Sequence, residues 1–191
     1  MEKVAQFFLL TIFIFCANSN AFAQENTVIK KGLLRAHSTL CTGKNLKHNI
    51  SNFYLHGVFE GYLEKTVSVA GEAYYYLGEL NAANELFEFN HSLFFGASKH
   101  FVKNKNDFYI GLQPGVSITK MNSNYITFNK TDVGVNPLFS GVVGYNLYVS
   151  NFFHFFIQSR IIVGNHNYDK QINLTEIRCS AGLGLNLNSI K

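Results

Sequence analysis

The stretch Thr66-Val-Ser-Val-Ala-Gly-Glu-Ala-Tyr-Tyr-Tyr-Leu-Gly78 alternates between two kinds of side chain. Its odd positions, from Val67 to Leu77, are mainly apolar, whereas its even positions are polar, small or amphipathic. Successive side chains of a β-strand point to opposite faces, so this alternation predicts a strand with one apolar and one polar face. The stretch is also about twice as long as an ordinary globular strand of five or six residues.

The same alternation recurs along most of the chain. It is clearest in 52–63, 108–119 and 176–187. A strand that crosses a bilayer at a tilt needs about 9–11 residues, and most of the alternating segments exceed that length. We count eight such segments, at about 30–41, 48–63, 66–79, 86–101, 107–120, 136–150, 152–165 and 173–188.

The connections between these segments alternate in length. Short connections lie near 64–65, 102–106 and 150–151, and longer ones occupy 42–47, 80–85, 121–135 and 166–172. Short turns at one end and longer loops at the other are the arrangement of single-chain outer-membrane barrels. The sequence therefore predicts an all-β fold, an eight-stranded antiparallel transmembrane β-barrel in which the first strand pairs with the last.

Composition excludes several other classes of protein. Of 191 residues, only 15% are charged, against about 25% in a typical soluble domain. Two prolines and 15 glycines do not fit a collagen-like or proline-rich disordered chain. The formal charge of +4 is small and scattered, so we expect no nucleic-acid partner.

Residues 1–23 have the three parts of a secretory signal peptide. The charged start contains Lys3, an apolar run covers 7–16, and Ala21-Phe-Ala23 is the small-x-small pattern that signal peptidase recognises. We expect cleavage before Gln24, which leaves 24–191 as a single exported barrel domain. Two cysteines then remain, Cys41 and Cys179, and either a disulfide between them or two separate thiols is compatible with export.

The main structural alternative is a soluble, exported lipocalin-like barrel, whose apolar face would turn inward around a ligand. The polar faces here carry serine, glycine, asparagine and glutamine rather than the many lysines and glutamates of a water-facing exterior. This favours a membrane barrel with the apolar face in lipid. The positions expected to face lipid are Val67, Val69, Leu112, Val116, Ile118, Leu183 and Leu185. An interfacial aromatic girdle is expected from Phe53, Phe87, Phe101, Phe108, Phe139 and Phe153.

Several phrases of the second half carry a resemblance to a known family. They are Asp107-Phe-Tyr-Ile-Gly-Leu-Gln-Pro-Gly-Val-Ser-Ile118, Asn136-Pro-Leu-Phe-Ser-Gly-Val-Val-Gly-Tyr145, Phe153-His-Phe-Phe-Ile-Gln-Ser-Arg160 and Glu176-Ile-Arg-Cys-Ser-Ala-Gly-Leu-Gly-Leu185. They resemble the small outer-membrane β-barrel proteins in which a signal peptide precedes one OmpA/OmpX-type barrel domain. The resemblance implies a bacterial outer-membrane location and the lipid bilayer as partner, but little chemistry.

Five charged residues fall on the polar faces near the middle of their strands. A buried charge without a partner costs several kcal/mol, and eight strands enclose an interior only wide enough for side chains. We therefore expect a mutually neutralising cluster that plugs the lumen, with each arginine near a carboxylate. Its members are Glu60, Glu72, Arg160, Glu176 and Arg178.

The sequence shows no recognisable catalytic, cofactor or metal motif. His37-Ser38 and His91-Ser92 are the adjacent histidine–serine pairs, and neighbours in a strand point to opposite faces. Seven scattered histidines lack the spacing of a metal site. We expect no cofactor and no catalysis, but a structural or interaction role through loops 42–47, 80–85, 121–135 and 166–172, with envelope or extracellular proteins as partners. The alternative is a barrel enzyme or carrier acting on lipid or a small apolar ligand.

Overall fold

The computed structural model describes residues 28–80, 85–122, 133–166 and 172–188. The expected signal peptide, 1–23, and most of the longer loops lie outside the described residues. The described residues form nine strands, eight of them long. Their bounds are β1 Leu33–Asn45, β2 Ser51–Glu64, β3 Val67–Glu79, β4 Phe87–Lys103, β5 Asn106–Met121, β6 Gly134–Tyr148, β7 Phe153–His166, β8 Ile172–Asn173 and β9 Glu176–Asn188.

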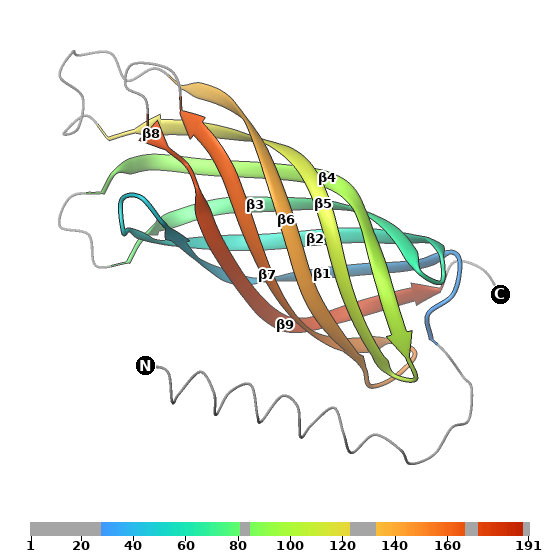
Figure 1. Ribbon diagram of the computed structural model, residues 1–191. Coiled ribbons are helices and arrows are strands. Elements are labelled where there is room, and N and C mark those ends of the chain that lie inside the picture. Colours follow the sequence, from blue (N-terminus) through green and yellow to red (C-terminus); the bar gives the residue numbers. More distant parts are fainter. Residues whose placement is uncertain (1–27, 81–84, 123–132, 167–171, 189–191) are drawn as a thin grey trace, which may run out of the picture.

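The eight long strands close into a barrel (Figure 1). Each pairs antiparallel with its sequence neighbour from β1 to β7, β7 pairs with β9, and β9 pairs with β1. The two-residue strand β8 only extends the edge of β7 at Asn165 and His166. The expected eight-stranded antiparallel barrel with first and last strands paired is confirmed.

The two ends of the barrel differ as expected. Three short connections, 65–66, 104–105 and 149–152, lie at one end, which we call the turn end. The strand ends on either side of the other connections lie at the opposite end, the loop end, and the described chain both begins and finishes at the turn end (Figure 1). Asn104 has a positive φ of 56°, a conformation that asparagine tolerates better than most residues in a tight turn.

One expected loop is largely strand. Residues 42–45 continue β1, because Gly43 and Asn45 are buried, Thr42 and Lys44 are exposed, and all four pair with β9. The strand therefore continues through a polar segment that composition alone assigned to a loop, because alternation and ladder pairing persist there. Only 46–50 connect β1 to β2.

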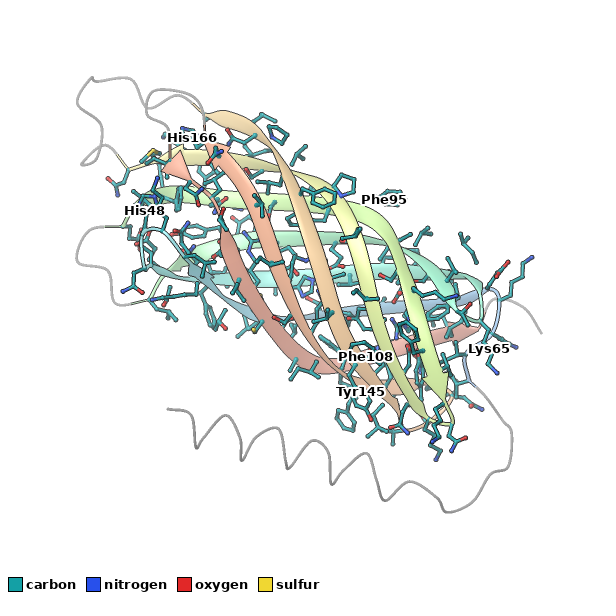
Figure 2. The ribbon with its side chains drawn as sticks, viewed as in Figure 1. His48, Lys65, Phe95, Phe108, Tyr145 and His166 are labelled. Carbon is teal, nitrogen blue, oxygen red and sulfur yellow. The ribbon has the colours of Figure 1, made fainter. Side chains whose placement is uncertain are left out.

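The outer surface of the barrel is apolar. Leu112 is 63% exposed, and large aliphatic and aromatic side chains cover the wall on every long strand (Figure 2). The expected lipid-facing positions are confirmed: Leu112, Val116, Ile118, Leu183 and Leu185 are exposed, and Val67 and Val69 are half-buried on the same outer face. A soluble barrel with its apolar face inward is therefore wrong for this chain.

The aromatic girdle is partly as expected. Phe101, Phe108, Phe139 and Phe153 are exposed on the outer wall, and Phe53 is half-buried. The assignment of Phe87 to the girdle is wrong, because this side chain is only 1% exposed and packs inside the barrel. A register shift between Phe87 and Phe89 in the β4–β5 ladder reverses the face of Phe87 relative to the rest of β4.

Within the described residues, no helix is long and apolar enough to span a membrane.

Candidate functional site: the polar interior of the barrel

The structure places the five charged residues of the sequence analysis inside the barrel, where each is at most 5% exposed. They do not form a single cluster. Glu176 and Arg178 lie towards the loop end, Glu72 and Arg160 at mid-height, and Glu60 towards the turn end. Each pair or single residue belongs to a separate hydrogen-bonded network, which we call the loop-end, central and turn-end networks.

The central network is built around Glu72 of β3. One carboxylate oxygen of Glu72 lies 2.5 Å from Arg160 Nη2 and accepts a hydrogen bond of 3.0 Å from Gln113. The other accepts a bond of 2.9 Å from Gln158 and lies 3.0 Å from His56 Nε2. Glu72 of β3 is therefore linked across the lumen to side chains of β2, β5 and β7.

The loop-end network surrounds Glu176 at the start of β9. Arg178 donates to Glu176 through Nε at 2.9 Å, and Tyr54 and Asn52 of β2 also donate to this carboxylate. The Arg178 guanidinium lies 3.9 Å from the centre of the Tyr54 ring and donates to Ser92 Oγ at 2.6 Å. The carboxylate and the guanidinium are thus both surrounded by partners.

Arg160 and Arg178 occupy directly paired positions on β7 and β9. Two guanidiniums so placed would repel each other if they pointed the same way. Arg160 instead lies over the Phe94 ring at 4.6 Å and reaches Glu72, whereas Arg178 lies over Tyr54 and reaches Glu176. The repulsion is relieved because each arginine pairs with a different carboxylate.

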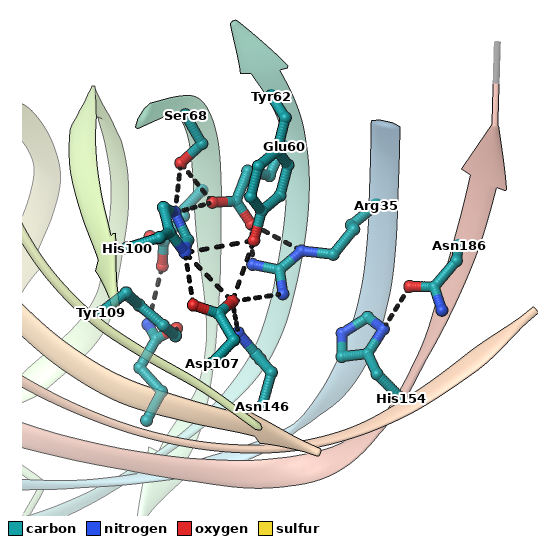
Figure 3. Close-up of polar contacts among 12 residues, drawn as sticks. Arg35, Glu60, Tyr62, Ser68, His100, Asp107, Tyr109, Asn146, His154 and Asn186 are labelled. Carbon is teal, nitrogen blue, oxygen red and sulfur yellow. Dashed lines mark hydrogen bonds and ion pairs between the residues drawn. The ribbon is translucent and has the colours of Figure 1, made fainter. Parts of the chain in front are cut away.

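The turn-end network contains three charged or titratable residues that the sequence analysis missed: Arg35, His100 and Asp107 (Figure 3). Arg35 Nε donates to Glu60 at 2.9 Å, and Arg35 Nη1 lies 3.7 Å from Asp107. His100 lies between the two carboxylates, 3.2 Å from Glu60 and 3.0 Å from Asp107. Tyr62, Ser68, Asn146 and Tyr148 complete the network with hydroxyl and amide hydrogen bonds.

The buried charges of the described lumen nearly balance. Four carboxylates, Glu60, Glu72, Asp107 and Glu176, accompany three guanidiniums, Arg35, Arg160 and Arg178. Glu72 and Glu176 each have their own arginine, so Glu60 and Asp107 share Arg35. His100 is the one further basic side chain in contact with both of these carboxylates, and its imidazolium form makes this described interior neutral.

Within this network, Ser68, His100 and Asp107 have the order of contacts of a hydrolytic triad. Ser68 Oγ lies 2.8 Å from His100 Nε2, and His100 Nδ1 lies 3.0 Å from Asp107. However, Ser68 is fully buried and also hydrogen bonds to Glu60, so its hydroxyl has no open face for a substrate. The three residues act as links of the network in this conformation.

The described residues contain neither a grouped metal centre nor a disulfide. In the parts of the chain that the structure describes, no three histidine, cysteine or acidic side chains are gathered as a metal centre. Cys41 and Cys179 are both free. Cys41 faces the lumen and Cys179 the outer surface, so the barrel wall separates the two thiols and the disulfide alternative is not realised.

Taken together, a closed antiparallel barrel, an apolar outer wall and a charged interior define the class of small eight-stranded membrane barrels. No family model matches the sequence, and no curated protein matches it in sequence. Solved structures do match its fold, over nearly their whole lengths and at low identity.

Three of these structures are bacterial outer-membrane barrels. Neisserial surface protein A has a TM-score of 0.64 at 11% identity, covering 81% of this chain and 96% of its own. The outer membrane protein OprG from Pseudomonas aeruginosa also has a TM-score of 0.64 at 11% identity, covering 84% and 98%. The N-terminal β-barrel domain of Pseudomonas aeruginosa OprF has a TM-score of 0.58 at 12% identity, covering 82% and 98%. The fold is that of small outer-membrane β-barrels, as the sequence resemblance implied.

Proposed function

We propose that this chain is an integral protein of the bacterial outer membrane, with a lumen closed by side chains and a biological role carried by its loop end. The apolar wall supports residence in a bilayer, since 33 large hydrophobic side chains are exposed on the described surface. A water-soluble protein seldom exposes contiguous apolar patches on this scale.

The observation that carries the closed lumen is the position of Glu72. Its carboxylate contacts side chains from β2, β5 and β7, so it bridges the barrel rather than lining one wall. Networks above and below it, around Glu176 and Glu60, repeat the obstruction at two further heights. An eight-stranded barrel has room for little beyond its side chains, and this one fills that room with paired charges.

The loop end is proposed as the functional surface because it would face the outside of the cell. Outer-membrane barrels place short turns in the periplasm and longer loops outside. One further fold neighbour, the attachment invasion locus protein Ail of Yersinia pestis, has a structure in complex with the heparin analogue sucrose octasulfate, at 12% identity and a TM-score of 0.51. For this chain we propose envelope or extracellular proteins as partners of the loop end, at 46–50, 80–85, 121–135 and 166–172.

Ion conductance tests the closed lumen. Purified wild-type protein in planar bilayers is expected to show no sustained conductance. The double variant Glu72→Ala, Arg160→Ala removes the central obstruction and should allow brief or small conductance events. Sustained conductance of the wild type would contradict the proposal.

Loop replacement tests the proposed surface separately. A short turn in place of 123–132 should leave the barrel folded, as judged by its heat-dependent gel mobility, and should abolish binding of the protein to whole cells or envelope fractions. A matched replacement of the turn 149–152 at the opposite end should not affect binding. Equal binding by both variants would contradict the assignment of the role to the loop end.

A further inference from the structure

The ladder between β1 and β9 is interrupted near its middle. The two strands pair from Leu33 to Ala36 and again from Cys41 to Asn45, but 37–40 and 181–184 do not pair with each other, although both segments are described and each pairs with its other neighbour, β2 or β7. The register is the same on both sides of the interruption, so the strands lose their pairing here without slipping relative to each other. We call these two segments the seam.

Side chains replace part of the missing ladder. Thr39 Oγ1 donates to the carbonyl oxygen of Ala181 at 2.8 Å. Gly182 faces the lumen here, and a Cβ at this position would lie 3.2 Å from both Phe156 and Thr39. Four inward-facing residues at the seam are partly exposed: His37, Thr39, Val58 and Gly182. Arg35 and Cys41, which lie on either side of the seam along β1, are buried. The interior is therefore less closely packed at the seam than on either side of it along β1.

Three imidazoles lie directly behind the seam. The His37 ring centre is 5.6 Å from that of His56 and 6.3 Å from that of His154, and His37 stacks on Phe156 at 3.8 Å. His56 and His154 are fully buried. We call these three residues the imidazole cluster.

Each ring of the imidazole cluster has a buried nitrogen without a hydrogen-bond partner: His37 Nε2, His56 Nδ1 and His154 Nε2. His154 Nδ1 donates to Asn186 Oδ1 at 2.7 Å, because an amide oxygen can only accept. His56 Nε2 likewise donates to the Glu72 carboxylate. The remaining nitrogens of these two rings are therefore lone pairs in the neutral form, and each can accept a proton.

Each carboxylate near the cluster already has a basic partner outside it. The charged groups that face the cluster are Arg35 of β1, Glu60 of β2, Glu72 of β3, Asp107 of β5, Arg160 of β7 and Arg178 of β9, with the hydroxyls of Tyr74 and Tyr148 nearby. Only His56 touches a carboxylate, and Arg160 already pairs with that carboxylate. Protons added to the three rings would therefore repel one another and the guanidiniums.

We propose that the imidazole cluster is a proton-binding site that opens the β1–β9 seam in acid. Mutual repulsion of protonated rings is relieved when water enters and β1 moves away from β9, which is easiest where the ladder is already interrupted. This inference goes beyond the proposed function, because it concerns the barrel wall and depends on neither the closed lumen nor the loops.

Amide hydrogen exchange at the seam tests this proposal on the folded protein in detergent. Between about pH 8 and pH 5, the range over which imidazoles titrate, protection of the ladder amides that flank the seam, in 33–36, 41–45, 177–180 and 185–187, should fall about tenfold after correction for intrinsic exchange, and we call this quantity the seam protection. The variant His37→Phe keeps the stack on Phe156 and removes the central imidazole, so its seam protection should change much less. His91→Phe, on the outer face of β4, is the control and should behave like the wild type.

Two results would overturn the proposal. One is an equal acid-induced loss of protection in the wild type and in His37→Phe. The other needs no variant: nitrogen NMR spectra of the wild-type histidines that show His37, His56 and His154 still neutral at a pH where the seam is open in most molecules. Unchanged seam protection together with protonated rings would exclude it as well.

Discussion

At the scale of single residues, the interior of this barrel is held by carboxylates that each satisfy several donors. Glu72 is the clearest case, since Arg160, Gln113, Gln158 and His56 all contact its two oxygens. Breaking a buried ion pair by removing one partner is far more costly than replacing both partners by apolar residues. The energetic role of the central network therefore lies in mutual satisfaction of its members.

A double-mutant cycle at Glu72 and Arg160 measures this role. Glu72→Leu leaves the Arg160 charge buried without its carboxylate, and we expect the free energy of unfolding to fall by about 3–5 kcal/mol. Adding Arg160→Leu should recover a substantial part of the loss. Because the chain contains no tryptophan, the folded fraction in urea is best followed by gel mobility. A double variant as unstable as Glu72→Leu alone would argue against coupling of the two residues.

His100 allows a test of charge balance in the turn-end network. His100→Gln removes the side chain that contacts both Glu60 and Asp107, which leaves two carboxylates with Arg35 alone. We expect destabilisation of about 3 kcal/mol. Adding Asp107→Asn, which removes one negative charge, should restore part of the stability in the same urea titration. Further destabilisation by Asp107→Asn would show that hydrogen bonding, not charge, dominates this network.

The odd or even position of a residue within its strand is enough to assign Glu60 or Arg160 to the inward face from the sequence. It cannot supply their partners, because Glu60 meets Arg35, 25 positions away, and Gln158 meets Glu72, 86 positions away. These contacts depend on the register of every intervening ladder. Asp107 was missed because it lies at the first position of its expected segment, where the boundary between strand and turn is hardest to locate. Arg35 lies inside the expected segment 30–41, but Leu33 and Leu34 before it are both apolar, so alternation does not assign its face.

At the scale of the strands, the side chains on the outer face determine whether the barrel is suited to lipid or to water. Val143 of β6 is 43% exposed near the middle of its strand, and Val133, just before the same strand, is 50% exposed at the loop end. The two valines are similarly accessible but differ in depth. They form a matched pair for measuring the environment of the wall.

Substituting each valine by arginine tests that environment. Val143→Arg should lower the free energy of unfolding in lipid vesicles by about 2–4 kcal/mol, whereas Val133→Arg should cost about 0–1 kcal/mol. The physical reason is the depth-dependent cost of placing a charge in the hydrocarbon layer. Equal effects of the two substitutions, measured by urea unfolding in the same vesicles, would be inconsistent with a bilayer at the height of Val143.

Strand boundaries show where sequence patterns fall short. The alternation of β1 continues through 42–45, but its lysine and threonine side chains suggested a loop. Phe87 was assigned to the wrong face because a register shift beside it breaks the period of two. Both errors arise at the loop end, where pairing with a neighbouring strand, rather than local composition, determines how far a strand extends.

At the scale of the whole molecule, closure of the sheet, the apolar wall and the charged interior are one arrangement. Alternation with the apolar face outward was sufficient to predict all three from the sequence, because a closed barrel in lipid has only two environments for its side chains. The interruption of the seam could not be predicted, since alternation does not show the contacts there, in which Phe156 and His154 pack against Gly182 and Gly184 of β9.

The most direct test of this arrangement is a nitroxide scan along β5, from 108 to 118, in lipid vesicles. The native cysteines would first be replaced by serine. Labels at the exposed positions 108, 110, 112, 116 and 118 should be accessible to oxygen dissolved in the bilayer, and labels at 109, 111, 113 and 117 should be shielded from it. Oxygen accessibility at the buried positions instead of the exposed ones would contradict a membrane barrel with a polar interior. Accessibility of every position to a water-soluble relaxation agent would contradict it as well.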